Sequence, residues 1–352
     1  MKIFEKITNA YQKKTPFVVY RKPKADVVSG FFMNTDALFY SEDFSEKGFV
    51  FAPFNNEQKA ILFPEELSEF ISEELFFKIL NFKERAFCTP DVSKDHHIQL
   101  VDKAIEEIIK NDLKKVVVSR KEVLEITEFN LIKIYQKLLQ TYKNAFVYVW
   151  YHPKIGLWLG ATPETLLDVE DTIFKTMSLA GTQVYKNIKN VVWKSKELEE
   201  QQLVTDFIER QLKGISSNLK IDKKETIKAG SLLHLSTQVT GVLNQNSTLK
   251  TLIRALHPTP AVCGLPRGNA KKFILENEQY DRSFYTGFLG ELNMKSDKKK
   301  VINSSLFVNL RCMNIDENRV SVFVGGGITK ESIAKKEWKE TVSKSKIMKR
   351  VL

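Results

Sequence analysis

The sequence is poor in cysteine and has no long apolar run, and both absences exclude classes of protein. Its cysteines are Cys88, Cys263 and Cys312, which lack the spacing of metal ligands or of a disulfide framework. No apolar run approaches the roughly 20 residues of a membrane span, and the N-terminus lacks the apolar segment of a signal peptide. We therefore expect a cytoplasmic protein that has no disulfides and no membrane attachment.

Recognisable nucleic-acid motifs are also absent, although the chain is basic. Lys and Arg number 54 against 43 Asp and Glu, which gives a net charge of +11, and the lysines are dispersed. The densest run, Lys298 to Lys300, is expected to be a solvated hairpin turn. A basic balance can serve nucleic acid, an acidic membrane or an acidic metabolite. A dianionic small substrate fits this charge as well as nucleic acid does.

The apolar pattern predicts helices and strands in irregular alternation. A hydrophobic fraction of 43%, with 24 Phe, is typical of a packed globular protein. No βαβ regularity, flexible linker or repeat is present, and short connections favour antiparallel pairing. We expect one α+β domain over residues 1–352, in which antiparallel sheets form a core flanked by helices. Residues 1–92 would be a variable part of this domain, and residues 93–352 would carry its motifs.

Hydrophobic periodicity also predicts individual elements. Strands are expected at residues 115–120, 146–150, 157–160, 173–179, 284–292, 301–313 and 320–324. Helices are expected at residues 64–80, 93–108, 131–139 and 249–256, around Glu197 and Glu200, and from 332 to the C-terminus.

Two pairs of glutamates are the most informative feature of the chain. Glu197 and Glu200 lie three residues apart on a predicted helix, as do Glu337 and Glu340, so each pair shares one helix face. If the two helices face each other, their carboxylates offer hard oxygen ligands suited to Mg²⁺. An arbitrary pair of this kind is more often a solvated helix face, and the neighbouring sequence has to decide.

Three neighbouring features favour an anionic ligand. The run Gly325 to Gly327, placed between a predicted strand and the last helix, either lets a ligand approach the backbone or forms a tight turn. Lys344 continues the stripe of Glu337 and Glu340 on the last helix. Arg311 stands in a predicted apolar strand, where a guanidinium is either exposed or buried with an anionic partner.

Three further residues are ambiguous by themselves. Lys115 begins a predicted strand, Glu164 follows a strand in a proline-containing turn, and His234 stands in a leucine-rich segment. Alone they would be an ordinary strand lysine, a surface carboxylate and a core histidine.

Together these segments resemble the chorismate-utilising enzymes: anthranilate synthase component I, isochorismate synthase, salicylate synthase and aminodeoxychorismate synthase. The resemblance covers roughly residues 95–350 in family order and leaves the N-terminal third uncovered. The matching motifs are KVVVSR (115–120), GATPE (160–164), LAGT (179–182), KELEEQQLV (196–204), LHL (233–235), HPTPAVCG (257–264), DRSFYTG (281–287), LRC (310–312), GGG (325–327) and EWKETVSK (337–344).

The resemblance implies the anthranilate synthase component I-like, chorismate-binding fold and a role for each residue. Glu200 and Glu340 match the direct Mg²⁺ ligands, with Glu197 and Glu337 behind them or bound through water. The positions that match the substrate pocket are Gly181, Thr182, His234 and Ala261 around the ring, and Tyr285, Arg311, Gly325, Gly327 and Lys344 around the enolpyruvyl carboxylate.

A few positions bear on the subfamily. Ala180 stands where aminodeoxychorismate synthases typically carry a lysine, and Lys115 resembles the water-using branch of isochorismate and salicylate synthases. The apolar Val262 favours stopping at isochorismate. Glu291 departs from many members, as does the long hairpin tract over residues 293–303.

The resemblance therefore implies an isochorismate synthase, an Mg²⁺-dependent isomerase that converts chorismate reversibly to isochorismate. Lys115 would be the general base that activates water to attack C2, and Glu164 the general acid that protonates the departing C4 hydroxyl. The product would serve menaquinone or siderophore biosynthesis, and we expect a monomer without a glutaminase subunit and without nucleic acid. Salicylate synthase stays an alternative, and a non-catalytic basic nucleic-acid-binding protein a distant one.

Overall fold

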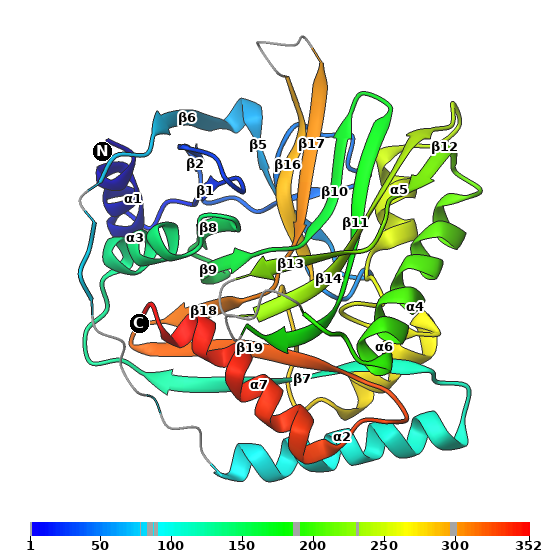
Figure 1. The fold of residues 1–352 in the computed structure, drawn as a ribbon. Helices are drawn as coiled ribbons and strands as arrows, with labels where there is room; N and C mark the ends of the chain where they lie inside the picture. The colour runs from blue at the N-terminus through cyan, green and yellow to red at the C-terminus, as the bar shows by residue number, and fades with distance from the viewer. Residues whose placement is uncertain are drawn as a thin grey trace.

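The computed structural model describes residues 2–77, 79–82, 87, 91–185, 191–229, 232–295 and 301–352. Within them the chain forms two large antiparallel sheets that pack face to face, with helices on the outside (Figure 1). The first sheet has the order β15 (Gly264–Leu265), β7 (Lys115–Glu125), β19 (Arg319–Ile328), β18 (Cys312–Asp316), β9 (Gly156–Thr162), β8 (Phe146–His152), β1 (Phe17–Arg21), β2 (Val27–Met33), β6 (Ser68–Glu74).

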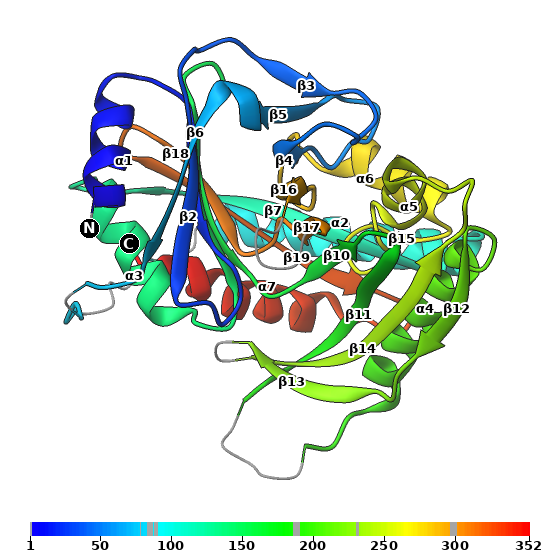
Figure 2. The ribbon, with the colours of Figure 1, turned by 90° about the horizontal axis from the view of Figure 1, so that it is seen from above.

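The second sheet carries the other half of the molecule. Its order is β12 (Ser216–Ile221), β14 (Leu232–Leu243), β11 (Ile173–Val184), β10 (Thr165–Glu170), β17 (Ile302–Val308), β16 (Phe288–Lys295), β4 (Gly48–Ala52), β5 (Ala60–Pro64), β3 (Phe39–Ser41), and β13 (Glu225–Ala229) pairs with β14. The helices are α1 (Lys2–Gln12), α2 (Asp91–Lys110), α3 (Leu131–Thr141), α4 (Ser195–Leu212), α5 (Leu249–Leu256), α6 (Arg267–Asn277) and α7 (Ala334–Lys349). Figure 2 shows α4 along the outer face of β11 and β14, and α7 along β19. The expected α+β fold of antiparallel sheets and flanking helices is confirmed.

Strand alternation explains why β8 is buried on both faces. Its alternate residues Phe146, Tyr148 and Trp150 join the aromatic core between the sheets, whereas Val147 and Val149 join the core beneath α1 and α3. Burying one such large apolar side chain contributes roughly 1.5–3 kcal/mol. This aromatic core accounts for part of the abundance of Phe in the sequence.

The helix expected at residues 64–80 is wrong. The chain there ends β5, makes one 3₁₀ turn (Glu65–Leu67) and forms β6, which pairs with β2 as an edge strand. An edge strand exposes one face and one edge, so its glutamates stay solvated. Glu69 forms an ion pair with Lys6, and Glu73 accepts hydrogen bonds from the first amides of α1.

The strand expected over residues 301–313 is also wrong, because the chain leaves one sheet and enters the other there. β17 ends at Val308 in the second sheet, and β18 begins at Cys312 in the first. Arg311 lies in this crossing with a φ of 48°. The predicted helices at 131–139 and 249–256 and the hairpin of β8 and β9 are confirmed.

Some expectations fall outside the described residues. Cys88 and the run Lys298 to Lys300 are among them, while Cys263 and Cys312 are buried and carry free thiols. None of the described helices is long and apolar enough to cross a membrane. The division at residues 92 and 93 stays a prediction.

Candidate active site

A cavity lined by residues of both sheets gathers most of the residues singled out from the sequence. Its lining includes all of the predicted site residues except Lys115 and Glu337. These two lie just behind the wall, on β7 and on α7. The remaining predicted residues that line the cavity are Glu164, Gly181, Thr182, Glu197, Glu200, His234, Ala261, Tyr285, Arg311, Gly325, Gly327, Glu340 and Lys344.

The three consecutive glycines lie inside β19, so the tight turn that the sequence left open is wrong, and they do not adjoin a helix N-terminus. Each pairs in register with a residue of β7, and α7 begins only at Ala334. Their small size still matters. A Cβ atom on Gly327 would lie 2.4 Å from Glu200 Oε1, and one on Gly325 would lie 3.0 Å from Tyr285 Oη. The glycines therefore leave room for a carboxylate and a phenol at the cavity wall.

A bulge in β11 brings α4 close to the cavity. Gly181 sits in this bulge with a φ of 69°, a conformation that glycine adopts at little cost. A Cβ atom there would lie 3.1 Å from the Cβ of Glu197. Gly181 thus permits the start of α4, which carries Glu197 in its first turn and Glu200 in the next, to pack against the strand.

Three of the four predicted metal ligands are paired with lysines. Lys115 Nζ lies 2.9 Å from Glu200 Oε1, Lys196 Nζ lies 2.6 Å from Glu337 Oε1, and Lys344 Nζ lies 2.7 Å from Glu340 Oε1. Burial pushes the pKa of Glu200 up, but the charge and hydrogen bond of Lys115, together with the charges of Lys344 and Lys196, outweigh it and leave that pKa below its ordinary value. Both Lys115 and Glu337 are buried, so these pairs neutralise charge in a poorly hydrated place.

The carboxylates fit a hard cation in the chemistry of their oxygen donors. Glu197 and Glu200 on α4 and Glu340 on α7 line one cavity and offer oxygen donors, as Mg²⁺ prefers. In the described part of the chain, no three acidic, His or Cys side chains converge closely enough to surround an ion as they stand. As the chain stands, Lys115, Lys196 and Lys344 hold Glu200, Glu337 and Glu340 through the ion pairs described above.

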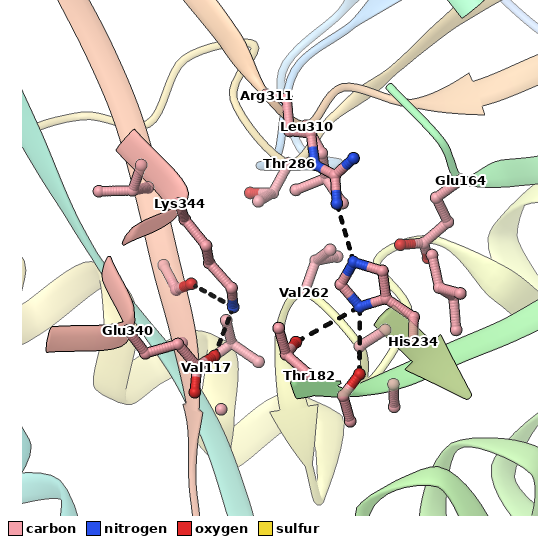
Figure 3. A pocket seen from close by; sticks show the side chains of 18 of the residues that line it. Val117, Glu164, Thr182, His234, Val262, Thr286, Leu310, Arg311, Glu340 and Lys344 are labelled. Atoms are coloured by element: carbon pink, nitrogen blue, oxygen red, sulfur yellow. Dashed lines mark hydrogen bonds and ion pairs between the residues drawn. The ribbon is translucent and has the colours of Figure 1, made fainter. Parts of the chain in front are cut away.

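His234 and Arg311 form a fixed polar pair on the cavity wall (Figure 3). Arg311 Nη2 donates to His234 Nε2 at 2.8 Å, so Nδ1 carries the ring proton and donates to the carbonyl of Gly181 at 3.1 Å. Burial lowers the pKa of His234 to about 3, and the Arg311 and Lys344 charges act in the same direction. The imidazole therefore stays neutral and orients the guanidinium, which was expected in a strand and instead lies in the crossing between sheets.

Glu164 is a buried carboxyl group at the cavity. It follows β9, is 3% exposed, and lies across the cavity from Lys344 in Figure 3. Burial raises its pKa to about 8, although Lys115 and Arg311 oppose the rise. At neutral pH Glu164 is mainly protonated and can act as an acid.

The raised pKa of Glu164 predicts a stability effect that depends on pH. The folded-state pKa of about 8 exceeds the unfolded value of 4.5, so stability falls as pH rises between these values. Glu164→Gln removes the ionisation. At pH 9 we expect this variant to be more stable than the wild type by roughly 3–5 kcal/mol, and at pH 4.5 to be nearly equal.

Urea unfolding at several pH values tests this expectation. Glu225→Gln on the exposed face of β13 is the matched control, and its effect should not change with pH. A Glu164→Gln variant no more stable than the wild type at pH 9 would contradict the buried, protonated carboxyl.

Sequence reasoning missed two kinds of residue. Lys196 lines the cavity but has no motif role of its own. Arg282 belongs to a matched motif, and its contacts to the backbone of the cavity wall emerge only from the fold.

Comparison with known proteins gives one consistent result. The family described as chorismate binding enzyme matches residues 64–352. The vibriobactin-specific isochorismate synthase of Vibrio cholerae serotype O1 is 29% identical over 245 residues, which cover 66% of this chain and 60% of that protein. The chain spans less than two thirds of the length of such curated relatives.

Two solved structures share the fold. One, from Bacillus anthracis and described as a 2,3-dihydroxybenzoate-specific isochorismate synthase, gives a TM-score of 0.81 at 23% identity and covers 99% of this chain and 98% of that one. The menaquinone-specific isochorismate synthase of Escherichia coli gives 0.79 at 22% identity, with coverages of 96% and 88%. At these identities the likeness concerns the fold alone.

Proposed function

Since the chain belongs to the chorismate-binding enzyme family, we propose that it is an isochorismate synthase. It would convert chorismate reversibly to isochorismate, adding water at C2 and releasing the C4 hydroxyl. The observation that carries this proposal is the buried Glu164, mainly protonated at neutral pH, in a cavity that is also lined by the cationic side chains of Arg311 and Lys344. The site thus offers cationic side chains for a dianionic substrate and an acid for its leaving hydroxyl.

Arg311 and Lys344 would bind the enolpyruvyl carboxylate. Arg311 is oriented by His234, and Lys344 Nζ donates to the carbonyl of Gly325 at 3.0 Å. Burial lowers the pKa of Arg311 to about 10, which still leaves the guanidinium charged at neutral pH. Tyr285, 3% exposed and stacked on Phe323, would close this side of the pocket.

Lys115 would serve as the base and Glu164 as the acid. Lys115 accepts a proton from the attacking water only when its amine is neutral and reaches the cavity, whereas here it is held by Glu200. Glu164 would donate its proton to the C4 oxygen, and after product release solvent would return a proton to Glu164 and accept the one held by Lys115. Each such proton transfer contributes on the order of 10²–10⁴-fold in rate.

Glu200 and Glu340 would hold Mg²⁺ directly, and Glu197 and Glu337 would support it or bind through water. The ion, when bound, neutralises the ring carboxylate and orients the ring. The lysine pairs at Glu200, Glu337 and Glu340 would loosen to admit it. A monomer without a glutaminase subunit fits the use of water as the nucleophile, and the product would feed menaquinone or siderophore synthesis.

Incubation of the purified protein with chorismate, resolved by chromatography, tests the proposal. We expect a mixture of chorismate and isochorismate, without pyruvate, that forms without ammonia and stops when EDTA removes Mg²⁺. Salicylate with equimolar pyruvate would identify a salicylate synthase instead. Turnover only after ammonia is added would contradict the role of water.

A further inference from the structure

Lys196 is held by the same carboxylates that are proposed to bind the metal. Its ammonium donates to Glu337 Oε1 at 2.6 Å, and Glu337 is 3% exposed. Burial lowers the pKa of Lys196, but the nearby Glu337, followed by Glu200 and Glu340, raises it by more in total. The net shift of the pKa is therefore upward. Its charge is thus stabilised by both helices that carry the candidate ligands.

The position of Lys196 would allow another cation to take its place beside Glu337. Its side chain is 28% exposed and lines the cavity, whereas the Glu337 carboxylate is buried behind it. Lys196 is the second residue of α4, adjacent to Glu197, and Glu337 is in the first turn of α7. The pair therefore joins α4 to α7 across the mouth of the site, and a long flexible side chain on the open side is the partner that can swing away.

We propose that Lys196 is an internal counter-ion that occupies the carboxylate site in the absence of metal and is displaced when a divalent cation binds. The inference rests on the proposed function for the identity of the ligands. Glu337 exchanges one cation for another, so the buried carboxylate is neutralised in both states. The metal affinity of the protein then includes the cost of breaking the pair with Lys196.

If Lys196 competes with the metal, removing it should change metal affinity in the direction opposite to that expected for a residue that supports the site. A residue that merely orients Glu337 would weaken metal binding when it is removed. A competitor strengthens metal binding when it is removed, and at the same time leaves the metal-free protein less stable, because Glu337 then stays buried without a counter-charge. Metal binding and metal-free stability therefore change in opposite directions.

Titration with MnCl₂ in the absence of substrate tests the proposal, with free Mn²⁺ measured by electron paramagnetic resonance. We expect Lys196→Met to bind Mn²⁺ roughly tenfold more tightly than the wild type, because a charged hydrogen bond no longer competes. Its metal-free form should melt at a lower temperature, and Mn²⁺ should raise that temperature by more than in the wild type.

Two variants complete the experiment. Lys339→Met removes an exposed lysine of α7 that lies between Glu337 and Glu340 in sequence, and it should bind Mn²⁺ like the wild type. Lys196→Arg keeps the charge and should bind no more tightly than the wild type. Equal or weaker binding by Lys196→Met, or tighter binding by Lys196→Arg, would overturn the proposal. The Mn²⁺ titration measures no turnover. Its result therefore tests the role of Lys196 even if the protein fails the isochorismate synthase assay.

Discussion

Replacing Lys115 by glutamine should lower the rate of isochorismate formation by on the order of 10²–10⁴-fold, because the attacking water loses its general base. Lys115 is fully buried, and its Nζ lies 2.9 Å from Glu200 Oε1. Because it is buried, the Lys115 side chain cannot be explained as a solvent-exposed lysine. The rate is measured with purified variants at saturating chorismate and Mg²⁺, with isochorismate resolved by chromatography.

A loss of rate has to be separated from a loss of the ion pair with Glu200. Lys115→Arg keeps a cation beside Glu200 but does not lose a proton near neutral pH, so it should be as inactive as Lys115→Gln. Lys114→Gln changes the exposed neighbour in sequence and should keep wild-type activity. Near-normal turnover by Lys115→Gln or Lys115→Arg would show that Lys115 is not the base.

The family resemblance seen in the sequence is confirmed by the match over residues 64–352. It succeeded because the chemistry of the site is encoded in local spacing. Glu197 and Glu200 are three residues apart, and helical geometry alone places them on one face. The order of the motifs then indicated that α4 and α7 contribute to the same site, which hydrophobic periodicity cannot predict.

Backbone conformation at the site was harder to predict. Arg311 is flanked by apolar residues that are typical of a strand, but the chain changes sheets there, and a φ of 48° at an arginine follows from the tertiary path. For the glycines of β19 the sequence left a tight turn open as an alternative to a ligand site, because glycine is common in turns. Their actual role, leaving space for Glu200 and Tyr285, depends on side chains that arrive from other elements.

Ion pairs between distant segments could not be predicted from sequence at all. Lys196 and Glu337 are 141 residues apart, and their contact depends on how the two sheets pack. The same holds for Glu291, which was singled out only as a departure from the family. It accepts hydrogen bonds from Tyr20 and Lys22 of the N-terminal part and so links the two parts of the chain.

Arg282 behind the cavity is a position where a single substitution should cost much stability. Its guanidinium forms a two-bond pair with Glu278, with Nη2 to Oε1 at 2.6 Å and Nε to Oε2 at 2.8 Å. Both side chains are almost fully buried, at 2% and 1% exposed. The same guanidinium also donates to the carbonyls of Val117 and Val262, two residues that line the cavity.

Arg282→Met should therefore reduce the free energy of unfolding by roughly 3–5 kcal/mol, because Glu278 keeps a buried charge without its counter-charge. The measurement is urea unfolding at pH 7. Lys272→Met on the neighbouring α6 is the matched control, since its pair with Glu276 is exposed at 75% and 59% and should contribute less than about 1 kcal/mol.

The double variant Arg282→Met, Glu278→Leu separates the pair from the packing around it. It removes both charges, so its destabilisation should be smaller than the sum of the two single changes. Additive losses would mean that Arg282 acts through its bonds to Val117 and Val262 rather than through Glu278. In either case the cavity wall depends on Arg282, because its guanidinium is what ties the carbonyl of β7 to that of the segment after α5.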